Sequence, residues 1–322
     1  MQLDQIREPV AEELRRLDEV IVARLASDVV LVNQVSQYIV GAGGKRLRPL
    51  SVVLAARACG YRGAQHVEAA AIIEFIHTAT LLHDDVVDGS GLRRGRHTAN
   101  EVFGNQASVL VGDYLYSRAF QMMVDLGDMR IQGVMADATN TIAMGEVLQL
   151  MNAHDPDTSE QSYLEVIYRK TARLFEAGAQ VAAILAQAPP AVEQAMVAYG
   201  RHLGTAFQLV DDALDYRADR TDLGKNLGVD LAVGKPTLPL IYALTRAAPE
   251  DAARLRTAIE RGGLDDLESI TRTIESSGGL EYTARLARRE KDLAIEALAD
   301  LPDSAHARSL RALADFAVSR TH

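Results

Sequence analysis

Two acidic clusters of the same form are the residues best suited to chemistry in this sequence. Residues 84–88 read Asp-Asp-Val-Val-Asp, residues 211–215 read Asp-Asp-Ala-Leu-Asp, and each cluster ends an apolar stretch of helical periodicity. Because positions i and i+4 share one face of a helix, the first and last aspartates of each cluster should project together. Carboxylates this close repel one another, and burial raises that cost unless cations are bound. The clusters comprise Asp84, Asp85, Asp88, Asp211, Asp212 and Asp215.

Clusters that offer only oxygen ligands suit a hard cation. Mg²⁺ keeps several waters and takes one or two carboxylates together with substrate phosphates. One such cluster is equally well explained as a solvated acidic helix end. Two copies, both preceded by apolar helix, favour a magnesium cradle for a diphosphate.

Basic residues that could bind the same anion lie beside glycine-bearing segments. Arg93 and Arg94 follow the first cluster, where paired guanidinium groups offer forked donors to phosphate oxygens. A glycine-rich turn at residues 41–44 precedes Lys45 and Arg48, and it is not a Walker loop because arginine follows the lysine. The chain has only five lysines, and four of them lie near these motifs: Lys45, Lys170, Lys225 and Lys235. This concentration predicts a polyanionic ligand.

His77 lies two helical turns before Asp84 and is expected to point toward the cradle, with a core histidine as the alternative. The spacing Glu74-x-x-His77 also matches half of a di-iron site. Because such a site needs a second copy, which the sequence lacks, a helical metal-binding protein is the less favoured hypothesis.

Composition excludes several classes of function. The 322 residues carry 44 acids and 34 bases, a net charge of −10, which argues against a nucleic-acid partner. A single cysteine, Cys59, rules out a disulfide within the chain. No apolar run is long enough for a transmembrane segment, and the N-terminus lacks the apolar core of a signal peptide, so a cytoplasmic location is expected.

Apolar residues recur at spacings of three and four almost throughout, and alternating β-branched runs are missing. This pattern predicts an all-α protein with a single domain over residues 1–322. Helices are expected at about residues 3–26, 29–40, 48–59, 65–89, 105–126, 130–152, 159–187, 191–219, 236–247, 250–261, 265–275, 278–299 and 303–320.

The motifs closely resemble those of the trans-polyprenyl diphosphate synthase family, in the expected order from about Gly41 to Pro239. Residues 78–88 and 145–151 are most similar to the octaprenyl diphosphate synthases of respiratory quinone biosynthesis. The motifs that carry the resemblance are Gly43-Gly44-Lys45-x-x-Arg48-Pro49, His77, both acidic clusters, Arg93-Arg94, Lys170-Thr171, Phe207-Gln208 and Gly234-Lys235-Pro236-Thr237.

The resemblance implies an antiparallel helical bundle around a deep central cavity, the isoprenoid synthase fold, and usually a homodimer. It implies two substrates, isopentenyl diphosphate and an allylic diphosphate such as farnesyl diphosphate, with two or three Mg²⁺ ions. By resemblance, the direct metal ligands would be Asp84, Asp88 and Asp211, completed directly or through water by Asp85, Asp212 and Asp215.

The same resemblance implies roles for the basic and polar residues. The allylic diphosphate would be held by Arg93, Lys170, Lys225 and Lys235. Isopentenyl diphosphate would be held by Lys45, Arg48, His77 and Arg94. Thr171 and Gln208 would place oxygen dipoles near the developing allylic cation. Arg320, near the C-terminus, is expected to belong to a solvated tail, and the alternative is a cover over the isopentenyl site.

The expected product is long. Ala79 and Thr80 lie about 6–7.5 Å along the helix axis before Asp84, where members that make short products usually carry an aromatic residue. Met123 and Met135 are candidate floor residues, although core packing explains them nearly as well. The resemblance implies octaprenyl diphosphate, a membrane-destined product for the side chain of ubiquinone or menaquinone. Nona- or decaprenyl (solanesyl-type) synthesis is the first alternative, and a short-chain product is less favoured.

Two related classes of protein share parts of this set of acidic and basic motifs. A terpene cyclase typically replaces the second acidic cluster with an Asn/Ser/Glu pattern, and a non-catalytic partner subunit tends to lose the aspartates and the bases. Both acidic clusters and the basic set are intact here, which favours chain elongation.

Overall fold

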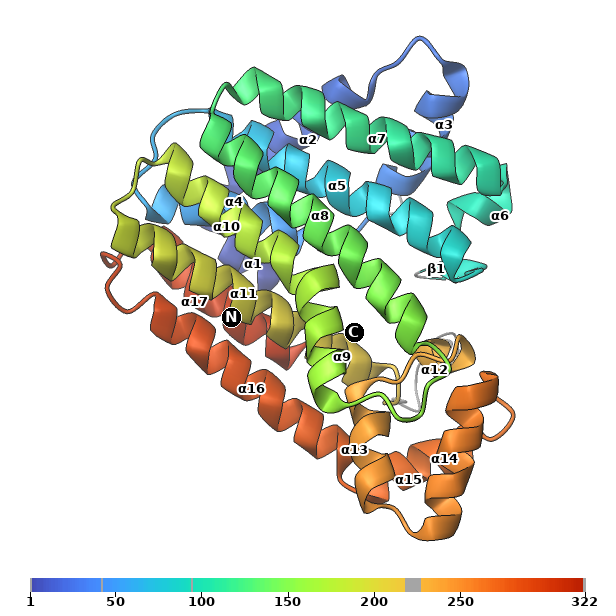
Figure 1. The fold of residues 1–322 in the computed structure, drawn as a ribbon. Helices are drawn as coiled ribbons and strands as arrows, with labels where there is room; N and C mark the ends of the chain where they lie inside the picture. Colours follow the sequence, from blue (N-terminus) through green and yellow to red (C-terminus); the bar gives the residue numbers. More distant parts are fainter. Residues whose placement is uncertain (1, 42, 94, 218–226, 321–322) are drawn as a thin grey trace. The chain divides into compact units, whose positions relative to one another are not determined.

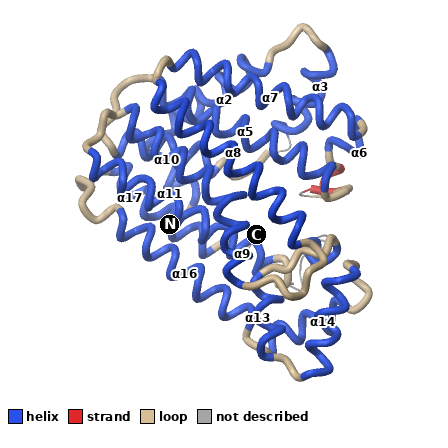
Figure 2. The backbone as a smooth tube through the Cα atoms, viewed as in Figure 1, coloured by secondary structure: helices blue, strands red, loops and turns tan. Residues whose placement is uncertain are grey.

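The computed structural model describes residues 2–41, 43–93, 95–217 and 227–320 (Figure 1). Within these ranges the only strands are β1 (Leu92–Arg93) and β2 (Arg96–His97), which pair antiparallel, and the other regular elements are helices joined by loops (Figure 2). The all-α class is therefore confirmed. None of the helices in the described ranges is long and apolar enough to cross a membrane.

The chain divides into two compact units. Unit 1 comprises Met1–Thr139, Ala177–Val197 and Leu298–Leu313, and unit 2 comprises Asn140–Glu176, Ala198–Ala297 and Ala314–His322. Four helices have residues in both units: α8 (Met129–Asn152), α10 (Arg173–Leu185), α11 (Pro190–Leu214) and α17 (Ala305–Ser319). The single domain expected over residues 1–322 stays a prediction.

Unit 1 is organised around α5 (Gln65–Val87), which packs against α2, α4 and α7. Ile72, Ile73, Phe75 and Ile76 of α5 are almost fully buried, as expected for a helix that is apolar on most of its faces. The other helices that lie wholly in unit 1 are α1 (Leu3–Arg7), a 3₁₀ turn (Glu8–Val10), α2 (Ala11–Leu25), α3 (Val30–Gly41), α4 (Leu47–Ala58), α6 (Ala99–Phe103) and α7 (Asn105–Leu126).

Unit 2 has two apolar clusters. One gathers Leu240, Leu255 and Ile259 around Tyr216, and the other gathers Leu209 and Leu238 around Tyr163. The elements that lie wholly in unit 2 are α9 (Glu160–Ile167), a π-helical turn (Tyr168–Ala172), α12 (Val229–Ala232), α13 (Leu238–Arg246), α14 (Pro249–Arg261), α15 (Leu267–Ser276) and α16 (Gly279–Ala297). Prolines at the first or second position begin α11, α13 and α14, where the missing N–H leaves no helical bond unmade.

Most expected helix boundaries agree with the structure to within a few residues, but two expected helices are interrupted. The helix expected over residues 3–26 is wrong, because Pro9 lies in a 3₁₀ turn between α1 and α2. The helix expected over residues 159–187 contains the π-helical turn Tyr168–Ala172. β1, β2, α6 and α12 were not expected, because elements this short show no hydrophobic period.

Candidate active site

The first acidic cluster lies at the C-terminal end of α5. Asp84 and Asp88 are half-buried, whereas Asp85 is fully buried. The Asp85 carboxylate accepts two bonds from Arg93, at 2.7 Å from Nη2 and 3.1 Å from Nε. The turn through Gly89, whose φ is +60°, and the short β1–β2 hairpin return the chain so that Arg93 faces α5. Arg93 and the first cluster therefore form one charged assembly.

The start of α4 places two other predicted residues together. Arg48 lies in the first turn of α4, and its Nη1 is 3.2 Å from Nε2 of His77 on α5. The preceding turn is held by the guanidinium of Arg7, which donates to the carbonyl of Lys45 at 2.7 Å. Unit 1 thus gathers Lys45, Arg48 and His77 at the N-terminal end of α4, as basic residues of one anion site would require.

The π-helical turn Tyr168–Ala172 carries Lys170 and Thr171. A Cβ at Gly145 of α8 would lie 2.7 Å from Cβ of Arg169 and 2.9 Å from the nitrogen of Lys170. A Cβ at Gly204 of α11 would overlap Ala172. Glycine is needed at both positions because the turn packs directly against two helix backbones, and π-helical turns are frequent at functional sites.

Side chains on this turn make polar contacts with α8 and α11. Lys170 Nζ lies 2.6 Å from Glu146 of α8, and the Thr171 hydroxyl donates to Oε1 of Gln208 at 2.9 Å. Gln208 Nε2 in turn donates to Asp212 at 2.7 Å. The Thr171 bond occupies the oxygen of the Gln208 amide, which leaves Nε2 to face Asp212.

The second acidic cluster ends α11, and its carboxylates have different partners. Asp212 is buried and accepts the Tyr163 hydroxyl at 2.5 Å. Asp215 accepts the backbone N–H groups of Val229 and Asp230, each at 3.1 Å. Burial and the nearby Asp230 carboxylate raise the pKa of Asp212 to about 8 and the pKa of Asp215 to about 7. This crowding of buried acids is what a bound cation would relieve.

Arg320 contacts the same cluster, so the solvated tail expected for it is wrong. Its side chain is 5% exposed, its Nη1 lies 2.5 Å from Asp211, and its Nη2 donates to the carbonyl of Phe207 at 2.6 Å. The guanidinium also lies over the Phe207 ring, 3.9 Å from the centroid. The end of α17 is therefore part of the surroundings of the second cluster.

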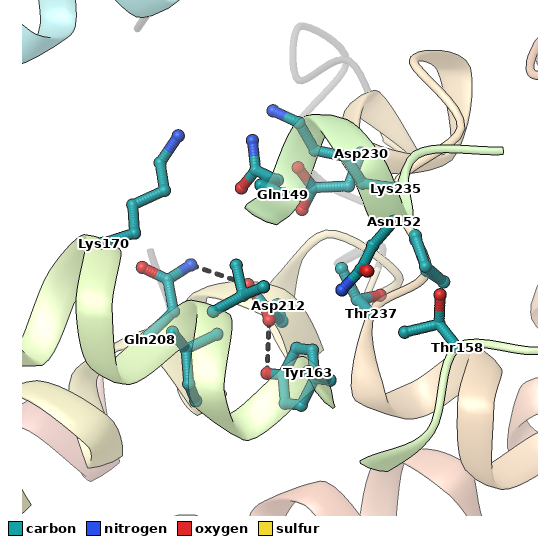
Figure 3. Close-up of a pocket in the computed structure, with 13 residues that line it drawn as sticks. Gln149, Asn152, Thr158, Tyr163, Lys170, Gln208, Asp212, Asp230, Lys235 and Thr237 are labelled. Atoms are coloured by element: carbon teal, nitrogen blue, oxygen red, sulfur yellow. Dashed lines mark hydrogen bonds between the residues drawn. The ribbon is translucent and has the colours of Figure 1, made fainter. Parts of the chain in front are cut away.

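A pocket in unit 2 is lined by Tyr163, Lys170, Gln208 and Asp212, together with residues of the Lys235 segment (Figure 3). Lys170 and Gln208 line it from one side in the view, Asp230 and Lys235 from another, and Asp212 lies between them with Tyr163 below. Gln149, Asn152, Thr158 and Thr237 add polar groups to its wall. The pocket combines mobile ammonium groups with carboxylates, which is the chemistry needed for a metal-bound diphosphate.

The proposed chain-length residues are all in unit 1. Ala79 is fully buried on α5, and the Thr80 hydroxyl donates to the carbonyl of His77 at 2.8 Å. Met123 on α7 and Met135 on α8 are each 1% exposed. Their roles in product length stay predictions.

Some expectations fall outside the described residues, and some site residues were missed. Arg94 and Lys225 lie outside the described ranges. Tyr163, Glu146 and Asp230 were not singled out, although Asp230, in α12, lies only five residues before Lys235. Among the described residues, no three His, Cys, Asp or Glu side chains form a ready-made metal site.

Comparisons of the sequence and the fold with those of known proteins identify the family. A family model described as polyprenyl synthetase matches residues 29–275. The chain is 56% identical to the octaprenyl diphosphate synthase of Escherichia coli K12 over 99% of both chains. A polyprenyl synthase from Caulobacter crescentus, solved with calcium and isoprenyl diphosphate, has a TM-score of 0.96 and 44% identity, covering 100% of this chain and 98% of that one. A decaprenyl diphosphate synthase from Rhodobacter capsulatus has a TM-score of 0.94 and 44% identity over the whole of both chains. This chain therefore belongs to the polyprenyl synthetase family.

Proposed function

We propose that this prenyltransferase is a long-chain trans-polyprenyl diphosphate synthase. It would condense isopentenyl diphosphate head to tail onto an allylic diphosphate such as farnesyl diphosphate, in repeated cycles. The observation that carries the proposal is the unit 2 pocket, where Lys170 and Lys235 share one lining with Asp212 and Asp230. Lysines neutralise phosphate oxygens, and carboxylates hold the hard cation that the same oxygens need.

The proposed product is octaprenyl diphosphate. The E. coli relative is named for that product and aligns over nearly its whole length at 56% identity. The decaprenyl synthase from R. capsulatus supports nona- or decaprenyl diphosphate as the alternative. Fully buried Ala79, a small residue one turn before the first acidic cluster, argues against a short-chain product.

The basic residues would divide between two diphosphates. Lys170, Lys235 and Arg93, with Lys225, would hold the allylic diphosphate. Isopentenyl diphosphate would be held by Lys45, Arg48 and His77, with Arg94. Two separate cationic sites hold both reactants for one step and so replace a bimolecular encounter by a local one.

The acidic clusters fit Mg²⁺. Their donors are all carboxylate oxygens, and burial raises the pKa of Asp212 and Asp215 in the absence of a compensating cation. Asp84 and Asp88 of unit 1 and Asp211 of unit 2 would bind ions directly, with Asp85, Asp212 and Asp215 completing the ligands within their own clusters, for two or three ions in all. When bound, Mg²⁺ stabilises the negative charge that develops on the leaving diphosphate.

Residues of the chain would protect and orient the allylic cation. Thr171 and Gln208 are joined by a hydrogen bond of 2.9 Å, and their oxygens would face the positive charge. The bond from Gln208 to Asp212 keeps the amide nitrogen turned toward the acidic cluster. Apolar helix surface would exclude water, which would otherwise capture the cation.

We also propose a homodimer. On α8, the side chains of Met144, Val147, Leu150 and Met151 are 44–72% exposed and recur at helical spacing. An exposed apolar helix face of this kind is typical of a protein interface, and a second copy of the chain is the proposed partner. The cytoplasmic location stays a prediction.

Incubation with farnesyl diphosphate and labelled isopentenyl diphosphate tests the proposed function. With Mg²⁺ the purified chain should form one long prenyl diphosphate, and with EDTA in place of Mg²⁺ it should form none. A terpene cyclase would consume farnesyl diphosphate without isopentenyl diphosphate, and a non-catalytic subunit or a helical metal-binding protein would consume neither. Either of these two results would reject the proposal.

A further inference from the structure

His154 has an unusual conformation in the turn that follows α8. Its φ is +64°, in the left-handed region that non-glycine residues rarely adopt. Strain of this kind persists only where surrounding contacts enforce it, and it concentrates at functional sites. The contacts of His154 all lie in unit 2 and lead to the loop that carries Lys235.

The imidazole of His154 packs directly on Gly234. A Cβ at Gly234 would overlap the ring, and Gly234 itself is buried whereas His154 is exposed, so the ring forms the outer cover of this backbone. Gly234 also has a positive φ, +69°. Glycine is therefore needed at position 234 for this backbone to approach the His154 ring.

The peptide group that joins Gly234 to Lys235 is held at both ends. Its carbonyl accepts the backbone N–H of His154 at 2.8 Å, and its N–H donates to the carbonyl of Asp230 at 2.8 Å. Because both polar groups of this peptide are bonded, its plane is set, and with it the direction in which the Lys235 side chain leaves the backbone. Lys235 then reaches the pocket lined by Asp212 and Asp230.

The His154 side chain connects this peptide to α14. Nδ1 lies 3.2 Å from the carbonyl of Ile259 in the last turn of the helix, so Nδ1 carries the proton and donates. Ile259 is fully buried in the core of unit 2, which makes it a rigid anchor. A second hydrogen bond, from the N–H of Gly263 to the carbonyl of Ala232 at 3.2 Å, ties the second residue after α14 to the end of α12, just before Gly234.

We infer that His154 is a positioning residue, which uses α14 as a support to aim Lys235 at the allylic diphosphate. This inference rests on the proposed function, and it gives the segment after residue 245 a part in substrate binding. His154 does not touch the pocket itself, since it is not among the residues that line it. Its effect would act on one substrate and not the other.

Two substitutions separate the side chain from the backbone strain. His154→Gly and His154→Asn both tolerate a positive φ, so neither should prevent folding. Glycine removes the ring and the donor, whereas asparagine keeps an N–H donor at the position of Nδ1. His202→Gln is the matched control, because His202 bonds Glu290 at 2.7 Å between α11 and α16, away from the Lys235 loop.

The experiment measures KM for each substrate, and the Kd of a non-reactive farnesyl thiodiphosphate by calorimetry with Mg²⁺. His154→Gly should raise KM for farnesyl diphosphate and this Kd by about tenfold, less than the roughly hundredfold loss that a 1 Å misplacement can cause. KM for isopentenyl diphosphate should change by less than about twofold. His154→Asn should restore wild-type values, and His202→Gln should lower Tm alone. Lys235→Ala serves as the positive control and should weaken analogue binding at least as much as His154→Gly.

Three results would overturn the inference: unchanged binding in His154→Gly, an equal rise in both KM values, or no rescue by asparagine. Failure of the proposed function looks different. In that case the wild-type protein would neither bind the analogue nor form product, and Lys235→Ala would have no effect to compare.

Discussion

Protonation of His66 should destabilise the folded protein in mild acid. His66 is the second residue of α5, its side chain is fully buried, and within the described structure neither ring nitrogen has a hydrogen-bond partner. Burial is the largest cause that lowers the pKa of His66 from 6.5 to about 4; the positive charges of Arg57 and Arg16 contribute in the same direction, and Glu13 opposes them. The ring therefore stays neutral at pH 7.

The sign and size of the effect follow from the two pKa values. Between pH 6.5 and pH 4 the unfolded chain binds a proton at His66 and the folded protein does not, so the free energy of unfolding falls as the pH falls. At about 1.36 kcal/mol per pKa unit, a fall from 6.5 to about 4 corresponds to about 3 kcal/mol. The loss should begin near pH 6.5 and level off near pH 4.

The assay is urea unfolding of wild type and His66→Leu at pH 7, 6, 5 and 4, followed by circular dichroism. Carboxylates also titrate in this range, so the difference between the two proteins is the relevant quantity. His66→Leu should lose about 3 kcal/mol less than wild type between pH 7 and pH 4. His306→Leu on α17, in the same unit, controls for the loss of an imidazole elsewhere. Parallel pH profiles for wild type and His66→Leu would refute the reasoning.

Further predictions concern the site and the product. Asp84→Ala should lower turnover at least a hundredfold at every Mg²⁺ concentration, and retained turnover would reject the magnesium cradle. Ala79→Tyr should stop elongation after few condensations, as seen by sizing the products; an unchanged length would reject this residue as a determinant. If Met135 forms the floor, Met135→Ala should lengthen the product, and no lengthening would assign Met135 to the core. Arg320→Gln removes an ion pair whose arginine is 5% exposed and whose Asp211 is 40% exposed. It should lower the free energy of unfolding by about 1–2 kcal/mol, and an unchanged denaturation curve would count against that contact.

Most helices could be predicted because their signal is local. The apolar period of α5 and the glycines and prolines between helices are visible in the sequence, and the expected span 65–89 matches Gln65–Val87 closely. The acidic clusters were equally accessible, since their spacing places carboxylates on one helix face. Arg93 could be proposed as a partner because it closely follows the first cluster, and Lys170 and Lys235 because four of the chain's five lysines lie near the motifs.

Other features depend on contacts between segments far apart in the chain. The π-helical turn at Tyr168–Ala172 occurs where Gly145 and Gly204 allow two helices to approach, and neither glycine lies near it in sequence. Tyr163 looks like an ordinary core residue until Asp212 is found 2.5 Å from its hydroxyl. The burial of Arg320 follows from where α17 ends, which periodicity cannot reveal.

The mass of the product made from farnesyl diphosphate and isopentenyl diphosphate tests the central claim most directly. With Mg²⁺ present, mass spectrometry of the dephosphorylated product should show one dominant alcohol of eight isoprene units, and omission of Mg²⁺ should abolish it. A dominant alcohol of nine or ten units would keep the synthase but change the assigned length. A product no longer than four units, or elongation that continues without Mg²⁺, would contradict the account.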